Sequence, residues 1–438
     1  MAVERSSALQ FTSALRPASR AAIRVLQVAR KRRGAAPRRL LPHRTHLETG
    51  TWDRRFCRRG LQQQGSFTFA ARLLGLLFAA SLCTTMEEPT AAAIGEVQAA
   101  FGADPSAAMC LYKAKSTLEA GLCTKLSFPN TPEHGETVVD EPPTMPGGKD
   151  AGPNPMDVCL GALATCQEIS YKAFATVMGI AVKSVACSVE GELDLRGFLG
   201  VDESVPKGFT SIKGTVTVDA PDATQEQLDQ LKGAVDAHCP MCDFLSGTCT
   251  LTLDVKTQAP TDATRDDGSL SAQAIGELGA ALGADPSAAK CTYKASSKLE
   301  KGLASSLTYP NTPHHGPYAT DEPQSMPGGQ NAGPNPMDLV LGALTTCQDI
   351  SYKAYATALG IDLQKVETAA EGDLDLRGFL GVDEAVRKGF QVIRGTVTLT
   401  TDADEATVAK LKGAVDAHCP MCATISEKIP ISLKVVKA

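Results

Sequence analysis

The chain has no excess of positive charge beyond its first 60 residues. The whole sequence carries a formal net charge of −6, although residues 1–60 contain fifteen Lys and Arg and only three acidic residues. The remainder is therefore strongly acidic. Because proteins that bind nucleic acid need a basic surface, this balance argues against a nucleic-acid partner.

Acidic residues are absent from the stretch 16–44, which is rich in Arg, Ala and Ser, as transit peptides are. A long uninterrupted apolar run is also missing. The run Phe67–Cys83 contains Arg72 and lies near the lower length limit of a membrane-spanning helix. It could be the second half of an import signal, a membrane anchor or sequence removed from the mature protein.

We interpret residues 1–90 as a targeting segment, disordered or removed, that directs the protein to an organelle. Its composition fits a chloroplast better than a mitochondrion, and a cytoplasmic protein is the alternative. The rest of the chain, with 43% hydrophobic and 21% charged residues overall, has the composition of a globular protein.

The body of the chain is an internal repeat. Three segments occur twice, about 180 residues apart: Ala93–Leu122 and Ala274–Leu303, Gly152–Ala175 and Gly333–Ala356, and Gly233–Cys242 and Gly413–Cys422. Each copy has about 165 residues, the size of a whole domain and too long for a solenoid repeat. We predict a first domain at 91–257, a polar linker at 258–271 and a second domain at 272–438.

Each copy begins with a predicted hairpin and a strong helix signal. In the first copy, Cys110–Leu118 and Thr124–Phe128 predict the hairpin. Asn154 is a suitable N-cap, Pro155 suits the first helical position, and Gly179 ends the apolar periodicity as a C′ residue would. The pattern predicts a long helix between them.

Two strands and a second helix follow. Residues 184–195 and 209–219 alternate as strands do, and a helix opens near Asp222. Pro240 breaks or restarts that helix, and residues 249–256 supply a closing strand. We predict an α+β domain in which two helices pack on antiparallel strands.

Eight of the fourteen cysteines are paired between the copies: Cys110 and Cys291, Cys166 and Cys347, Cys239 and Cys419, and Cys242 and Cys422. Four unpaired ones match small or apolar residues and read as buried hydrophobes: Cys123, Cys159, Cys187 and Cys249. Cys166 and Cys239 lie on the apolar stripes of the two helices. Packing those helices would bring the two sulfurs together, either as an inert part of the core or as a reversible dithiol.

The stretch "DEPPTMPGGKDAGPNPMDVCLGALATC", followed by "GELDLRGF" and by Cys-Pro after a second helix, resembles the OsmC/Ohr superfamily of osmotically inducible protein C and organic hydroperoxide resistance proteins. The resemblance covers about 150 residues of each copy. It implies an α+β domain that forms an intertwined homodimer with active sites at the subunit interface. It also implies a cysteine peroxidase that reduces organic hydroperoxides and is regenerated by dithiols such as lipoyl groups.

The resemblance assigns the peroxidatic role to Cys166 and Cys347, and the resolving role to Cys239 and Cys419. Since a thiolate is the nucleophile, Cys166 is expected to need a nearby cation. The hydroperoxide-resistance branch has an Arg in the first hairpin and a Glu directly after the helix-starting Pro, and this chain has neither. Supporting roles therefore pass to the nearest shared charged residues: Asp157, Asp338, Arg196, Arg377, Lys113 and Lys294.

Cys242 and Cys422 extend the Cys-Pro motif to Cys-x-x-Cys, which the resemblance does not require. They could relay oxidation through a local disulfide, or both Cys-x-x-Cys pairs could form one four-thiolate zinc site, or the added cysteines could pack. We favour a relay or packing over zinc, and we predict no metal and no cofactor.

Fusion of two copies of a dimeric domain predicts an intramolecular pseudo-dimer. The sequence therefore predicts a thiol-dependent peroxidase that uses a Cys-Cys dithiol/disulfide cycle. Its expected partners are an organic hydroperoxide and a lipoyl-type or thioredoxin-like dithiol reductant. The alternative is a non-catalytic redox-sensing or metal-binding thiol module on the same scaffold.

Overall fold

The structure is a computed structural model that describes residues 88–260 and 269–438. These residues belong to one compact unit. The predicted targeting segment up to residue 87, including Phe67–Cys83, lies outside the described residues, as does most of the predicted linker. None of the helices within the described ranges combines the length and the apolar character needed to cross a bilayer.

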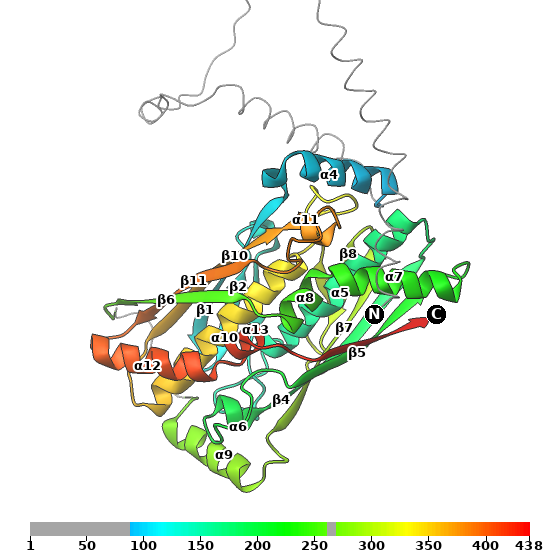
Figure 1. Ribbon diagram of the computed structural model, residues 1–438. Coiled ribbons are helices and arrows are strands. Elements are labelled where there is room, and N and C mark those ends of the chain that lie inside the picture. The colour runs from blue at the N-terminus through cyan, green and yellow to red at the C-terminus, as the bar shows by residue number, and fades with distance from the viewer. Residues whose placement is uncertain (1–87, 261–268) are drawn as a thin grey trace, which may run out of the picture. The chain divides into compact units, whose positions relative to one another are not determined.

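Both copies contribute the same series of elements (Figure 1). The first copy contains α4 (Ala91–Ala103), β1 (Met109–Ala120), β2 (Cys123–Ser127), β3 (Glu136–Val139), α5 (Pro155–Met178), β4 (Ser184–Asp194), α6 (Leu195–Phe198), β5 (Ser211–Asp219), α7 (Gln225–His238), α8 (Pro240–Ser246) and β6 (Thr250–Gln258). The second copy contains α9 (Ala272–Ala284), β7 (Lys290–Lys301), β8 (Ala304–Thr308), β9 (Tyr318–Thr320), α10 (Pro336–Ala358), β10 (Lys365–Asp375), α11 (Leu376–Phe379), β11 (Val392–Thr400), α12 (Glu405–His418), α13 (Pro420–Ser426) and β12 (Ile431–Lys437).

The predicted helix signals are confirmed. Asn154 caps α5 by accepting a hydrogen bond from the backbone N–H of Met156 at 2.8 Å. Pro155 opens this helix, and Gly179 ends it in the left-handed conformation at φ 70°. Pro240 ends α7 and begins α8, because it has no N–H to continue the first helix. The periodicity did not predict α4 and α9, the helices that begin each copy.

Each of the two six-stranded sheets is built from both copies. The strand orders are β3-β2-β1-β10-β11-β6 and β12-β5-β4-β7-β8-β9. The first strand of each copy pairs antiparallel with a middle strand of the other copy, β1 with β10 and β7 with β4. The pseudo-dimer is therefore intertwined through backbone hydrogen bonds.

One detail of the predicted topology differs. The closing strands β6 and β12 do not run antiparallel to their neighbours; they pair in parallel with β11 and β5, which belong to the other copy. Alternation along a strand indicates which residues face the core, but it carries no information on a partner strand supplied by another segment.

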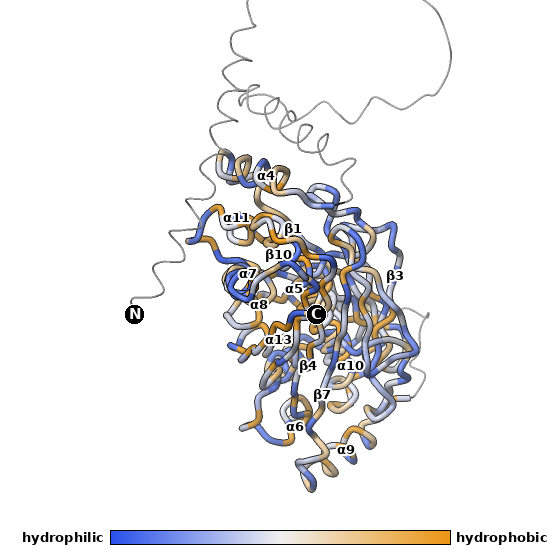
Figure 2. Tube along the Cα trace, turned by 90° about the vertical axis from the view of Figure 1, so that its right-hand side faces the viewer, coloured by the Kyte–Doolittle hydropathy of each residue, from blue (hydrophilic) through white to orange (hydrophobic). Residues whose placement is uncertain are grey.

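The two long helices lie between the sheets (Figure 1). Helix α10 packs on β1, β2 and β10 of one sheet, α5 packs on β4, β7 and β8 of the other, and the two helices pack on each other. Figure 2 shows hydrophobic residues concentrated in this interior and hydrophilic ones along α7. Nearly every residue of α5 and α10 is buried as a result.

A single copy should not form a stable monomer, because β1 and β6 would lose their partners β10 and β11. We expect residues 88–260 expressed alone to form a homodimer that restores these pairings between two chains. Light scattering coupled to size exclusion measures the mass. Residues 88–438, which contain both copies, serve as the reference, and we expect them to be a monomer. A folded, monomeric single copy would contradict the intertwined arrangement.

Two buried acids follow the central cysteines in the helices. Glu168 accepts hydrogen bonds from the backbone N–H of Cys187 at 3.0 Å and the hydroxyl of Ser297 at 2.8 Å. Burial raises its pKa from 4.5 to about 8. In the second copy, burial raises the pKa of Asp349 from 3.8 to about 8. Both side chains are therefore protonated at neutral pH.

This protonation makes stability depend on pH. As pH rises from about 4 to about 8, the unfolded chain releases two protons that the folded chain retains, so the free energy of unfolding falls. We expect Glu168→Gln with Asp349→Asn to remove up to about 3 kcal/mol of this decline per residue by pH 7. Urea unfolding between pH 5 and 8 measures it. Parallel pH profiles for the variant and the unmodified chain would contradict it.

Candidate functional site

Cys166 and Cys239 meet in the core of the first copy. Their sulfur atoms are 3.6 Å apart, and the equivalent sulfurs of Cys347 and Cys419 are 3.5 Å apart. All four side chains are buried, and none of them is in a disulfide. Because a disulfide needs about 2.05 Å between sulfurs, a small movement would join each pair. The predicted contact between the two helices is confirmed.

The local sequence explains this contact. Leu228, Leu231 and Val235 bury one face of α7 beside α5. The chain then bends at Cys239, the residue that caps α8, because Pro240 starts a new helix. This bend turns the cysteine toward the middle of α5, where Cys166 lies.

A third cysteine and a glutamine complete each site. The side-chain amide of Gln167 donates to the sulfur of Cys242 at 3.1 Å, and Gln348 donates to Cys422 at the same distance. Cys242 and Cys422 are half-buried, whereas the other cysteines of the sites are buried. We call the two sets the first and second sulfur clusters: Cys166, Cys239 and Cys242, and Cys347, Cys419 and Cys422.

Gln167 and Gln348 were missed by the sequence reasoning. The signal was present, because a Gln follows the helix cysteine in both copies. However, a Gln beside a cysteine has no chemical pattern of its own until the fold brings a third sulfur to it.

The hydrogen bonds of each cluster favour the thiolate form of the middle sulfur, Cys239 or Cys419. Burial alone would raise the pKa of Cys239, but the thiols of Cys166 and Cys242 act on it as hydrogen-bond donors. The backbone N–H of Cys242 and the amide of Gln167 act in the same direction, and together they hold the pKa of Cys239 well below 9.0. Cys419 is affected in the same way by Cys347 and Cys422.

The neighbouring thiols keep their protons. The hydrogen bond to Cys239 raises the pKa of Cys166, and burial adds to the effect. The pKa of Cys242 is raised for the same two reasons. The expectation of a lowered pKa at Cys166 is therefore not met in the reduced protein, where the lowered pKa belongs to its hydrogen-bond partner Cys239.

The predicted cations lie elsewhere. Arg196 binds Asp194 at 2.7 Å and Asp202 at 3.4 Å, and Arg377 binds Asp375 at 2.6 Å and Asp383 at 3.4 Å. These pairs hold the turns after β4 and β10. Neither Arg has a recorded contact with a sulfur cluster within the described residues.

The predicted acids also serve the fold. Asp157 accepts the backbone N–H of Lys294 at 2.7 Å, and Asp338 accepts that of Lys113 at 2.9 Å. Each acid therefore ties the start of one long helix to the first strand of the other copy. Burial raises the pKa of both carboxyls to about 7.

The remaining cysteines divide as follows. Cys159, Cys187 and Cys249 are buried, as predicted, whereas Cys123 is half-buried. Among the described residues, the two Cys-x-x-Cys pairs do not form a common cluster of metal ligands, since each lies beside the long helix of its own copy.

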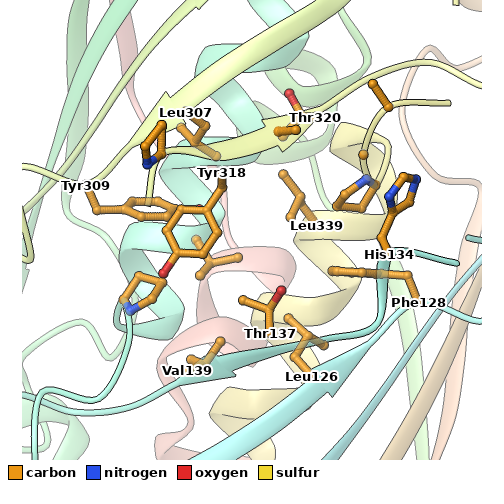
Figure 3. A pocket seen from close by; sticks show the side chains of 17 residues that line it. Leu126, Phe128, His134, Thr137, Val139, Leu307, Tyr309, Tyr318, Thr320 and Leu339 are labelled. Atoms are coloured by element: carbon orange, nitrogen blue, oxygen red, sulfur yellow. The ribbon is translucent and has the colours of Figure 1, made fainter. Parts of the chain in front are cut away.

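A separate apolar pocket of about 250 Å³ lies where the two copies meet at the starts of the long helices. Figure 3 shows Leu126, Val139 and Thr137 facing Leu307, Tyr309 and Tyr318 across it. Val158 of α5 also lines the pocket. At 1.5 Å per residue, Cys166 is about 12 Å farther along the helix, so the pocket is not part of the sulfur cluster.

The location of the thiolate can be tested by ultraviolet absorbance. We expect the reduced protein to show thiolate absorbance near neutral pH, and Cys239→Ser with Cys419→Ser to abolish it, because these sulfurs carry the charge. Cys110→Ser with Cys291→Ser is the matched control, since burial raises the pKa of both thiols. Thiolate absorbance that survives in the first variant would contradict the assignment.

Comparison with known protein families gives a match to both copies. A family model described as OsmC-like protein matches residues 147–254 and matches again at residues 328–434. Each match runs from the loop before the long helix to the closing strand, and each contains one complete sulfur cluster. A search of curated proteins finds no match to the chain.

Proposed function

Because the chain belongs to the OsmC-like protein family, with two successive domains of it, we propose that it is a thiol-dependent peroxidase that reduces organic hydroperoxides at two equivalent sites. The observation that carries the proposal is the sulfur–sulfur distance of 3.6 Å in one copy and 3.5 Å in the other. Two thiols at this distance can be oxidised to a disulfide by one hydroperoxide molecule and reduced again by a dithiol.

In the first step, the Cys166 sulfur attacks one oxygen of the O–O bond while its proton passes to the thiolate of Cys239 across their hydrogen bond. The O–O bond breaks, and the alkoxide takes this proton and leaves as an alcohol. Cys166 is then a sulfenic acid, and Cys239 is again a thiolate. The second site carries out the same step with Cys347 and Cys419.

In the second step, the Cys239 thiolate attacks the sulfur of the sulfenic acid. A disulfide forms between Cys239 and Cys166, and hydroxide leaves and becomes water on protonation. The hydroperoxide has then gained two electrons, and the two thiols have lost two. The hydrogen bonds within the cluster supply the charge stabilisation that an Arg supplies in the hydroperoxide-resistance branch of the superfamily that the chain resembles.

Cys242 provides a route out of the core. Its sulfur borders that of Cys239 and is half-buried, whereas Cys166 and Cys239 are 5% and 1% exposed. Attack by the Cys242 sulfur on the Cys239 sulfur would break the Cys166–Cys239 bond, pass the Cys242 proton to the released Cys166 sulfur and form a Cys239–Cys242 disulfide. A lipoyl-type or thioredoxin-like dithiol could then attack Cys242 without entering the core.

The test uses paired variants in both copies and an alkyl hydroperoxide with dihydrolipoamide as reductant. We expect Cys166→Ser with Cys347→Ser to reduce turnover to the background rate. Cys239→Ser with Cys419→Ser should slow the first oxidation, because the proton acceptor is lost, and any Cys166 or Cys347 that is oxidised should stop at the sulfenic acid, detectable by mass spectrometry. Cys242→Ser with Cys422→Ser should keep the first oxidation but slow the reduction by the dithiol.

The matched control is Cys110→Ser with Cys291→Ser, which removes a cysteine pair outside the clusters and should leave turnover unchanged. Full turnover without Cys166 and Cys347 would overturn their role as the attacking thiols. If the unmodified protein loses free thiols on addition of hydroperoxide but none of the dithiols tested supports turnover, the redox-sensing module becomes the better assignment.

A further inference from the structure

Asp150, His314 and His315 bring three metal-ligating side chains together from both copies. One nitrogen of each imidazole and one carboxylate oxygen all lie within 4.8 Å of one another. Asp150 belongs to the loop before α5, and the histidines belong to the turn before β9. We propose that these residues form a binding site for a divalent transition-metal ion of the zinc class, separate from the sulfur clusters.

The distances suit such an ion. The Oδ2 atom of Asp150 and the Nε2 atom of His314 are 3.1 Å apart. Two ligands of a tetrahedral zinc ion, each about 2.0–2.1 Å from the metal, are about 3.3 Å apart, so this pair needs little movement. Two imidazoles and one carboxylate form a ligand set that zinc accepts, with the fourth position left to water.

A backbone contact sets the tautomer of His315. Its Nε2 lies 2.7 Å from the carbonyl oxygen of Asp150, and because a carbonyl only accepts, this nitrogen carries the proton. In the neutral ring the lone pair is then on Nδ1, the nitrogen available to a metal. Metal-binding histidines commonly donate their second N–H to a backbone carbonyl in this way.

The loop that carries Asp150 is held in place. The carboxylate of Asp140 accepts the backbone N–H groups of Lys149 at 3.0 Å and Ala151 at 3.1 Å, and the N–H of Asp150 donates to the carbonyl of Glu141 at 3.0 Å. Asp150 has φ 55°, a left-handed conformation that Asp and Asn adopt more readily than other side chains. The ligand is therefore positioned before any ion binds.

The pseudo-symmetric position, where the two copies exchange roles, provides a natural comparison. There the positions of His314, His315 and Asp150 are occupied by Glu133, His134 and Asn331. His134, labelled in Figure 3, still contacts the carbonyl oxygen of Asn331, at 2.8 Å. However, the Asn331 amide donates to the Glu133 carboxylate, so this position presents N–H groups where a metal needs lone pairs. Within residues 88–260 and 269–438 we therefore expect one metal site of this kind.

The experiment titrates Zn²⁺ alone into the reduced full chain. Asp150→Asn and His314→Glu install the residues of the other half, whose loop has the same left-handed backbone (Asn331 φ 58°). We expect the unmodified chain to bind one more Zn²⁺ than either variant, or the same ion at least about tenfold more tightly. The added ion should also raise the unfolding temperature of the unmodified chain more than that of either variant, because it ties the two loops together.

Glu133→His combined with Asn331→Asp should create a second site and bind one further Zn²⁺. The proposal is overturned if the unmodified chain, Asp150→Asn and His314→Glu bind the same number of Zn²⁺ ions with the same affinity, provided that all three have the same unfolding temperature before metal is added. It is also overturned if the Glu133→His, Asn331→Asp variant folds but binds no further Zn²⁺. Co²⁺ spectroscopy distinguishes nitrogen and oxygen ligands from thiolate ligands. If the bound Co²⁺ that is lost in Asp150→Asn shows thiolate-to-cobalt charge transfer, the metal lies on cysteines and this site is refuted.

Discussion

The hydrogen bonds between β1 and β10, and between β4 and β7, are the constraint on which the rest of the structure depends. The first strand of each copy finds its backbone partners in the other copy, so neither sheet can be completed by one copy alone. Joining the sheets in this way encloses α5 and α10 between them. The sites are therefore buried because the copies are intertwined, and not because either copy has a large core of its own.

Burial in turn decides how the sulfur chemistry is arranged. An isolated buried thiolate is costly, and within the described residues no cation has a recorded contact with the inner sulfurs of either cluster. The charge on Cys239 is stabilised instead by neighbouring thiols, an amide and a backbone N–H. The hydrogen bond between Cys166 and Cys239 therefore both brings the two sulfurs into contact and lowers the pKa of Cys239.

Because the two copies are parts of one chain, their sequences can differ wherever the pairing of the copies does not require the same residue. Both sulfur clusters keep the same cysteines and the same glutamine. The loops beside the apolar pocket differ, with a His-His-Asp set in one half and a Glu-His-Asn set in the other. In a homodimer the two loops would have the same sequence, whereas a fused chain can build a single asymmetric site.

Much of this protein follows from the sequence. The repeat, the N-cap at Asn154, the end of the helix at Gly179 and the break at Pro240 are local features, and local backbone preferences determine them. The apolar stripes also predicted that Cys166 and Cys239 would meet, because two buried faces have to pack on each other. The family match rests on the same segments.

Other features depended on the tertiary structure, because they join residues that are distant in the chain. No pattern shows that β6 runs parallel to β11, that Asp157 accepts a backbone N–H of the other copy, or that Arg196 binds Asp194 and not a cysteine. The position of the thiolate also depends on how many donors surround each sulfur. The sequence by itself determined which cysteines the two copies share and which helices carry them, and the packing of the two copies decided which sulfurs meet and which hydrogen bonds lower the pKa of Cys239 and Cys419.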